Sequence, residues 1–118
     1  MTFLVEAYEK ANGDVPLIGF LSELNPKMRA KVLRDIDLLE KEGNLLREPY
    51  TKYLGNGIYE LRTKQSSDIA RTLFFFFTGN RIIITHGFTK KSDKTPSKEI
   101  NKALRYKEDW IRRNVDEI

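Results

Sequence analysis

The sequence predicts a small α+β domain whose elements follow the order β-α-α-β-β-β-α. Apolar residues recur at helical spacing between residues 14 and 43, whereas three segments between residues 58 and 89 have the composition of strands. The length of 118 residues suits one domain, residues 1–118, with a single core. We therefore expect a small antiparallel sheet, with two N-terminal helices on one face and a helix at the C-terminus.

The first 44 residues are expected to form one strand and two helices. Phe3–Tyr8 is short and rich in residues that favour strands. Asp14 and Asn25 are the predicted N-caps of the two helices, because a proline that suits the first helical turn follows each of them closely. Gly43 is expected to end the second helix, whose buried stripe is Met28, Val32, Ile36 and Leu39.

The rest of the chain is expected to contain a loop, three strands and a helix. Residues 45–57 are predicted to be a loop that ends in a glycine-rich turn. Thr95 is the predicted cap of the last helix, with Pro96 at its first position. The strands are predicted at residues 58–64, 69–78 and 81–89, and the last helix is expected to bury Ile100, Ala103, Leu104 and Ile111 with Trp110 at the edge.

The turn between the last two strands predicts how they pair. Gly79-Asn80 has the glycine-first pattern of a two-residue type II′ turn. Such a turn places Thr78 opposite Arg81. Counting back along both strands then places Arg71 opposite Phe88.

A four-residue loop over residues 65–68 would also place Arg62 opposite Arg71. The two arginines would then lie on one face of the sheet, together with Glu60, Lys64, His86, Phe88 and Lys90. The other face would be available for burial against the helices and would carry Tyr59, Leu61, Phe74, Phe76 and Ile83.

Two arginines directly opposite each other on antiparallel strands repel, at a cost of up to roughly 1 kcal/mol. One interpretation is that Arg62 simply pairs with Glu60 or Asp68. The other is that the two guanidinium groups hold an anion, because the planar fork of arginine matches the oxygens of a phosphate. The sequence leaves both interpretations open.

Positive charge is concentrated in the segment that holds the predicted sheet. Residues 45–91 carry eight basic and three acidic side chains, in a chain whose net charge is +4. This distribution favours an anionic partner, with nucleic acid first among the candidates. A modest excess of basic residues also serves solubility alone, so charge by itself does not decide the function.

The composition excludes several classes of function. The chain has no cysteine and one histidine, which excludes thiol catalysis and a two-histidine acid–base pair. No metal-ligand spacing or nucleotide-binding fingerprint is present, so we expect neither a metal nor a cofactor. No apolar run approaches the roughly 20 residues of a membrane span, and the N-terminus lacks a secretory pattern. We therefore expect a cytoplasmic protein without a membrane partner.

The remaining chemistry is that of a phosphate-handling face. In RNA the 2′-hydroxyl attacks the adjacent phosphodiester, so an enzyme mainly has to supply cations for the developing charge. Lys90 or Lys91 is a candidate for moving a proton among these cations. Phe88 either stacks on a splayed base or packs under the last helix. His86 is either a general base or a hydrogen-bonded core residue.

Three stretches of the chain together resemble the HigB branch of the RelE/ParE toxin superfamily, also described as phage-derived host-killer proteins. They are Leu54–Arg62 with its Glu-Leu-Arg end, Ala70–Phe76, and His86–Lys91 followed by Lys94-Thr95-Pro96. The likeness covers essentially the whole chain in the same order of elements. It implies a RelE-like fold and the toxin of a type II toxin–antitoxin system, acting as a ribosome-dependent mRNA endoribonuclease.

The resemblance also implies which residues act and which partners bind. Matched by motif, catalysis falls to Arg62, Arg71, Lys90 and Lys91, while Lys64, Phe88 and Lys94 are candidates for RNA binding and Glu60 and His86 for acid–base chemistry. RelE members have lysine at the position of Glu60, and their C-terminal tyrosine is matched only by Thr95 or Tyr106. The expected partners are mRNA, the ribosome and a HigA-like antitoxin with a helix-turn-helix domain.

Two alternative functions remain open beside the endoribonuclease. A toxin of the ParE kind shares the fold but poisons DNA gyrase by binding, and it needs no cleavage activity. A non-catalytic module would only bind an antitoxin and an operator. The endoribonuclease hypothesis predicts that Arg71→Ala abolishes cleavage without unfolding the protein.

Overall fold

The computed structural model describes residues 2–90 and 94–115 and confirms the predicted α+β class. Each of the three predicted C-terminal strands begins and ends within one residue of its expected bounds. The elements are β1 (Leu4–Ala7), α1 (Pro16–Glu23), α2 (Pro26–Glu42), the 3₁₀ helix η1 (Gly43–Leu45), β2 (Thr51–Gly55), β3 (Ile58–Gln65), β4 (Asp68–Phe77), β5 (Arg81–Thr89) and α3 (Ser97–Asn114).

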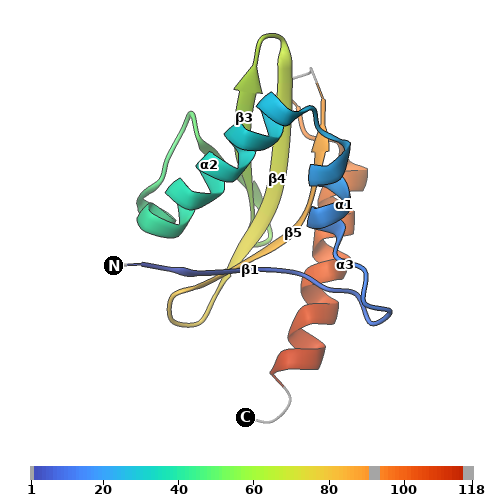
Figure 1. The fold of residues 1–118 in the computed structure, drawn as a ribbon. Helices are drawn as coiled ribbons and strands as arrows, with labels where there is room; N and C mark the ends of the chain where they lie inside the picture. The colour runs from blue at the N-terminus through green and yellow to red at the C-terminus, as the bar shows by residue number, and fades with distance from the viewer. Residues whose placement is uncertain (1, 91–93, 116–118) are drawn as a thin grey trace.

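Five strands form one sheet in the order β1-β5-β4-β3-β2. Helices α1 and α2 lie on one face of this sheet and α3 lies on the other, as Figure 1 shows. β1 pairs with β5 in parallel, whereas the other three pairs are antiparallel. The expectation of a wholly antiparallel sheet is therefore wrong at β1. No tight turn fixes the direction of this strand, because two helices separate it from the rest of the sheet.

The sequence prediction also missed β2, since residues 45–57 were expected to be a loop. β2 is a short edge strand that pairs with β3, and its alternation is weak because both Lys52 and Tyr53 are exposed. The glycine-rich turn that follows is confirmed. Gly55, Asn56 and Gly57 all have positive φ, at 99°, 53° and 81°, and they join β2 to β3 as a hairpin.

The helix ends follow the prediction for α2 but not for α1 and α3. Asn25 caps α2 by accepting a hydrogen bond from the Met28 N–H at 2.8 Å, and the helix stops at Gly43 with φ 54°. The N-cap position of α1 is Val15 rather than Asp14, and no side chain caps it. The N-cap position of α3 is Pro96 rather than Thr95, and the Thr95 hydroxyl donates to Glu60 instead.

The register of the three long strands agrees with the prediction at the end of the sheet that holds Arg62, Arg71 and Phe88. Arg62 lies opposite Arg71, and Arg71 lies opposite Phe88. The turn itself differs, because Phe77 rather than Thr78 pairs with Arg81, and β5 regains the expected register through a bulge at residue 85. A bulge inverts the alternation of side chains beyond it.

The inverted alternation explains one wrong assignment in the core. Ile83 packs on the α3 side, although the sequence placed it with the residues that face α1 and α2. The cluster under α1 and α2 contains Leu17, Phe20, Met28, Val32, Leu39, Leu61, Ala70, Phe74, Ile82 and Ile84. The cluster under α3 contains Tyr8, Ile58, Leu73, Phe75, Ile83, Ala103 and Trp110. Trp110 is thus a core residue of α3 and does not lie at the edge of its stripe.

The ends of β1 and α3 are joined by polar contacts. The Tyr8 hydroxyl donates to Asp109 Oδ2 at 2.7 Å, and Arg113 also donates to this carboxylate. The Arg113 guanidinium and the Tyr8 hydroxyl hold the pKa of Asp109 below its usual value. Among residues 2–90 and 94–115, none of the helices has the length and apolar character that crossing a bilayer requires.

Candidate functional site

Most of the predicted functional residues lie in two neighbouring rows on the α3 face of the sheet. The first row is formed by Arg62, Arg71 and Phe88 on β3, β4 and β5. In the second row Lys64 lies opposite Ile69, and the Lys90 N–H donates to the Ile69 carbonyl at 3.0 Å. Side chains two residues apart on a strand share a face, so the two rows form one surface.

A buried carboxylate lies beneath the facing arginines. Glu60 is fully buried, and its Oε1 accepts a hydrogen bond from Arg71 Nη1 at 3.0 Å. The same oxygen lies 3.5 Å from Arg62 Nε. Glu60 therefore offsets the repulsion between the two arginines, as one of the two interpretations of the sequence expected.

The second oxygen of Glu60 accepts a hydrogen bond from the Thr95 hydroxyl. Thr95 is buried and comes directly before Pro96, the N-cap residue of α3, so this contact fixes the N-terminal end of the helix against β3. The sequence assigned Thr95 to a helix cap and so missed its contact with Glu60. Only the fold brings the two residues, 35 positions apart, together.

Arg71 does not belong to the open surface on which the sequence placed it. Its side chain has no exposed area, whereas 15% of the Arg62 side chain is exposed. A guanidinium without exposed area cannot contact a phosphate in this arrangement, and the charge of Arg71 is paired with Glu60. The expectation of an accessible Arg71 is therefore wrong, while its assignment to catalysis stays a prediction. In this structure Arg71 positions Glu60.

His86 occupies a buried position under α3. Its Nδ1 lies 3.1 Å from the Thr85 hydroxyl and its Nε2 lies 2.9 Å from Glu99 Oε1. Burial lowers the pKa of His86 below its usual value of 6.5, and this effect outweighs the opposing effect of the Glu99 carboxylate. The geometry thus agrees with the hydrogen-bonded core histidine and weakens the case for a general base. Sequence reasoning did not identify Glu99 as its partner.

Phe88 and the lysines form the outer part of the candidate site. Phe88 is half-buried, stacks on His86 with 6.2 Å between ring centres, and packs against the cluster under α3. Lys64, Lys90 and Lys94 are exposed. Lys91 lies outside the residues that the structure describes. Lys64 and Lys90 therefore add accessible positive charge in the row next to Arg71, and Lys94 comes directly before Thr95, which contacts Glu60.

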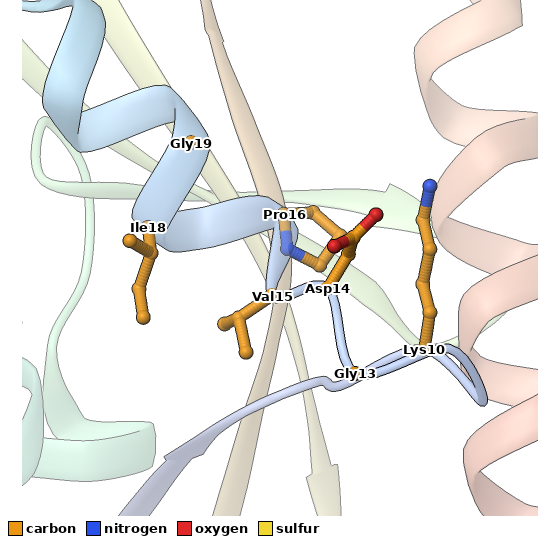
Figure 2. A pocket seen from close by; sticks show the side chains of 7 residues that line it. All are labelled: Lys10, Gly13, Asp14, Val15, Pro16, Ile18 and Gly19. Carbon is orange, nitrogen blue, oxygen red and sulfur yellow. The ribbon is translucent and has the colours of Figure 1, made fainter.

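The hollow at the start of α1 lacks comparable chemistry. A depression of about 520 Å³ lies at the start of α1, and among its lining side chains Lys10 and Asp14 are charged (Figure 2). The remaining lining residues are Gly13, Val15, Pro16, Ile18 and Gly19. Across residues 2–90 and 94–115, no group of three or more His, Asp or Glu side chains is placed to hold a metal ion.

A second cationic region lies at the edge of β3 and was not expected from the sequence. Arg34 of α2 and Tyr50 line a depression of about 240 Å³ together with Arg62 and Lys64. Arg34 was missed because it lies on a helix that was assigned only a core role, and Tyr50 because its segment was assigned to a loop. Exposed aromatic and basic residues near each other in a loop are a weak signal until the fold is known.

A comparison with known protein families places this chain. Residues 19–108, well over half of the sequence, match the model of the phage-derived protein Gp49-like family (DUF891). No curated protein matches the chain significantly. The match begins inside α1, covers α2 and all the strands that carry the candidate site, and ends inside α3. The chain belongs to the Gp49-like family of phage-derived proteins, a family of RelE-like toxin–antitoxin toxins.

Proposed function

We propose that this protein is the toxin of a type II toxin–antitoxin pair, of the HigB type, and that it cleaves mRNA on the ribosome. The observation that carries the proposal is the group of accessible cations close to the buried pair of Arg71 and Glu60. Arg62 is partly exposed and Lys64 and Lys90 are exposed at the same end of the sheet, and the exposed Lys94 comes directly before Thr95, which contacts Glu60. Membership of the Gp49-like family supports the assignment.

The proposed reaction is attack of a 2′-hydroxyl on the neighbouring phosphorus. The O2′–P bond forms, the P–O5′ bond breaks, and the proton of the 2′-hydroxyl leaves as the 5′-oxygen gains one. Negative charge grows on the non-bridging oxygens in the transition state. Fixed cations at this position lower the barrier more than a strong nucleophile of the enzyme would. We assign this role to Arg62 and Lys94.

The buried residues have a different role in the proposal. Arg71 and Thr95 hold Glu60, and Glu60 in turn fixes the guanidinium of Arg62 at the surface. These residues position the contact with the phosphate and do not touch RNA. Lys90 is the proposed proton carrier, because it is an exposed lysine whose backbone pairs with Ile69 in the row next to Arg71. Both ring nitrogens of His86 are engaged within the protein, which leaves it a structural role.

The partners are part of the proposal. A helix-turn-helix antitoxin would keep the toxin inactive, and an acidic segment of it would suit the basic surface. The proposal predicts growth arrest when the chain is expressed alone and relief when its antitoxin is co-expressed. High yield of the wild-type protein without growth arrest would contradict it.

The decisive test is a map of new 5′ ends on a reporter mRNA in a translating extract. Wild-type protein should produce ends that disappear when translation is blocked. Lys90→Gln should reduce them strongly, whereas Arg105→Gln, a matched change of an exposed cation on α3, should not. Ends that persist without translation would indicate a free ribonuclease. No new ends would contradict the nuclease, and gyrase supercoiling would then be measured.

A further inference from the structure

We infer that the depression at the edge of β3 binds one nucleotide of a single-stranded RNA, with its base stacked on Tyr50. This inference rests on the proposed function, because it names how the same surface holds its substrate. The depression measures about 240 Å³ and is lined by Arg34, Asp35, Pro49, Tyr50, Arg62 and Lys64. Its volume is below the roughly 300–1,000 Å³ of sites for whole small molecules, but it suits one flat group.

The end of β2 creates this depression. β2 begins at Thr51, so β3 continues beyond it without a neighbour on that side. The last contact is the hydrogen bond from the Arg62 N–H to the Tyr50 carbonyl at 2.8 Å. The depression therefore lies between the segment before β2, the free edge of β3 and the side of α2.

Tyr50 is held in place although its side chain is exposed. Its N–H donates to the Arg47 carbonyl at 2.9 Å and its carbonyl accepts from Arg62, so both backbone groups are fixed. Its exposed fraction is nevertheless 44%. An aromatic ring presented by a fixed backbone loses little conformational entropy when a base stacks on it.

The charges around Tyr50 favour an anionic ligand. Arg34 of α2 has 69% of its side chain exposed, and Lys64 of β3, which lines the same depression, is also exposed. The nearby Asp35 is buried, with Oδ2 accepting from the Thr63 hydroxyl at 2.8 Å and Oδ1 lying 3.5 Å from Arg34 Nε. Two phosphates flanking a stacked base would find Arg34 on one side and Lys64 with Arg62 on the other.

A second depression extends the path along α2. It measures about 460 Å³ and shares Arg34, Asp35 and Tyr50 with the first, to which it adds Asp37, Leu38 and Lys41. Tyr50 thus borders two adjoining hollows, as expected for a ring between successive nucleotides of an extended strand. A duplex would not fit this arrangement, because its bases are already stacked and paired.

The test is fluorescence anisotropy with a labelled single-stranded oligoadenylate RNA over a series of salt concentrations. Tyr50→Ala should weaken binding about tenfold or more, whereas Tyr50→Phe, which keeps the ring, should bind like the wild type. Arg34→Gln and Lys64→Gln should each lower the slope of log K against log salt by about 0.7. Tyr53→Ala, which removes another exposed tyrosine of the same edge, and Arg105→Gln are the controls.

Three outcomes would overturn the inference. Binding by Tyr50→Ala equal to that of the wild type would exclude stacking. Equal affinity for duplex RNA would exclude a splayed base. Competition by polyglutamate that depends on Arg34 and Lys64 but not on Tyr50 would assign the surface to an acidic protein segment instead.

The outcome is separable from that of the proposed function. RNA binding that requires Tyr50, without new ends in the translating extract, would contradict the nuclease and leave the nucleotide site standing. New ends with unchanged RNA binding by Tyr50→Ala would support the nuclease and contradict the nucleotide site.

Discussion

The two faces of the central sheet are held to their helices by different chemistry. On the face of α1 and α2 the contacts are mostly apolar, with Val32 and Leu39 fully buried against the strands and a buried hydrogen bond from Thr63 to Asp35. On the face of α3 an apolar cluster is joined by buried polar groups, among them Glu60, Arg71 and His86. The first face stabilises the fold by burying apolar surface, whereas the second also buries charged groups, which is costly in free energy. Such an arrangement is typical of a functional site.

The largest expected effect comes from breaking the buried ion pair. Arg71→Ala leaves Glu60 buried with one cation fewer, which should lower the free energy of unfolding by about 3–5 kcal/mol. This expectation replaces the sequence-based one that the variant stays folded. The matched control is Arg81→Ala, because Arg81 pairs with Glu6 at 2.9 Å in a half-exposed setting and lies over Trp110. Its loss should cost no more than about 2 kcal/mol.

Urea denaturation of both variants measures this difference. Equal losses from the two substitutions would show that the burial of the Glu60–Arg71 pair is not what sets its energy. The comparison also bears on activity assays, since a cleavage defect in Arg71→Ala would reflect unfolding as much as chemistry. Arg62 and Lys90 are the safer positions for testing catalysis.

A smaller effect is expected where α1 meets β5 on the apolar face. A Cβ atom added at Gly87 would lie 2.4 Å from the ring of Phe20, which is closer than packing allows. Gly87→Ala should therefore lower the free energy of unfolding by about 1–3 kcal/mol. Gly19→Ala is the control, because a Cβ there meets nothing within 4 Å. Thermal denaturation in which Gly87→Ala matches the wild type would show that Phe20 moves away freely.

The α3 face should also make stability depend on pH. Burial lowers the pKa of His86 below 6.5, so the folded protein keeps this side chain neutral while the unfolded chain takes up a proton. Stability is therefore fully retained above about pH 6.5 and falls as the pH drops from there to the lowered pKa. The slope is at most about 1.4 kcal/mol per pH unit. Groups facing His86 are Glu99, which opposes the shift, and Lys102, which adds to it.

Urea denaturation between about pH 7.5 and about pH 5.5 tests this dependence. His86 is the only histidine of the chain, so His86→Gln should remove most of the slope in this interval. A slope that survives in His86→Gln would have to come from carboxylates. Stability that rises on acidification of the wild type would contradict the direction of the shift.

The smallest effect is expected at the start of α2. Asn25→Ala removes the side-chain acceptor for the Met28 N–H and should cost about 1 kcal/mol. Asn25→Asp should be nearly neutral, because aspartate caps as well as asparagine. The measurement is the midpoint of urea denaturation for both variants. An Asn25→Ala protein as stable as the wild type would indicate that packing of α2 on the sheet alone fixes the helix end.

The sequence predicted the pairing of strands at the candidate site, because rules that act over a few residues determine this pairing. A loop of fixed length determines register, so the pairing of Arg62 with Arg71 was predicted correctly from spacing. The pairing of Arg71 with Phe88 was also correct, although two deviations underlie it. A turn longer by one residue and a bulge at residue 85 cancel each other there, and only Ile83 reveals the shift. No local signal distinguishes this case from a regular hairpin.

The sequence by itself determined the α+β class, the three long strands, the capping of α2 by Asn25 and the gathering of cations on one face. These features depend on periodicity, turn chemistry and capping, which act over a few residues. Only the tertiary structure decided that β1 runs parallel to β5, that Arg71 is buried on Glu60, and that Thr95 completes this contact. It also brought Arg34 and Tyr50 to the edge of β3. Burial and contacts between distant residues depend on how the helices pack on the sheet, and spacing along the chain does not encode that packing.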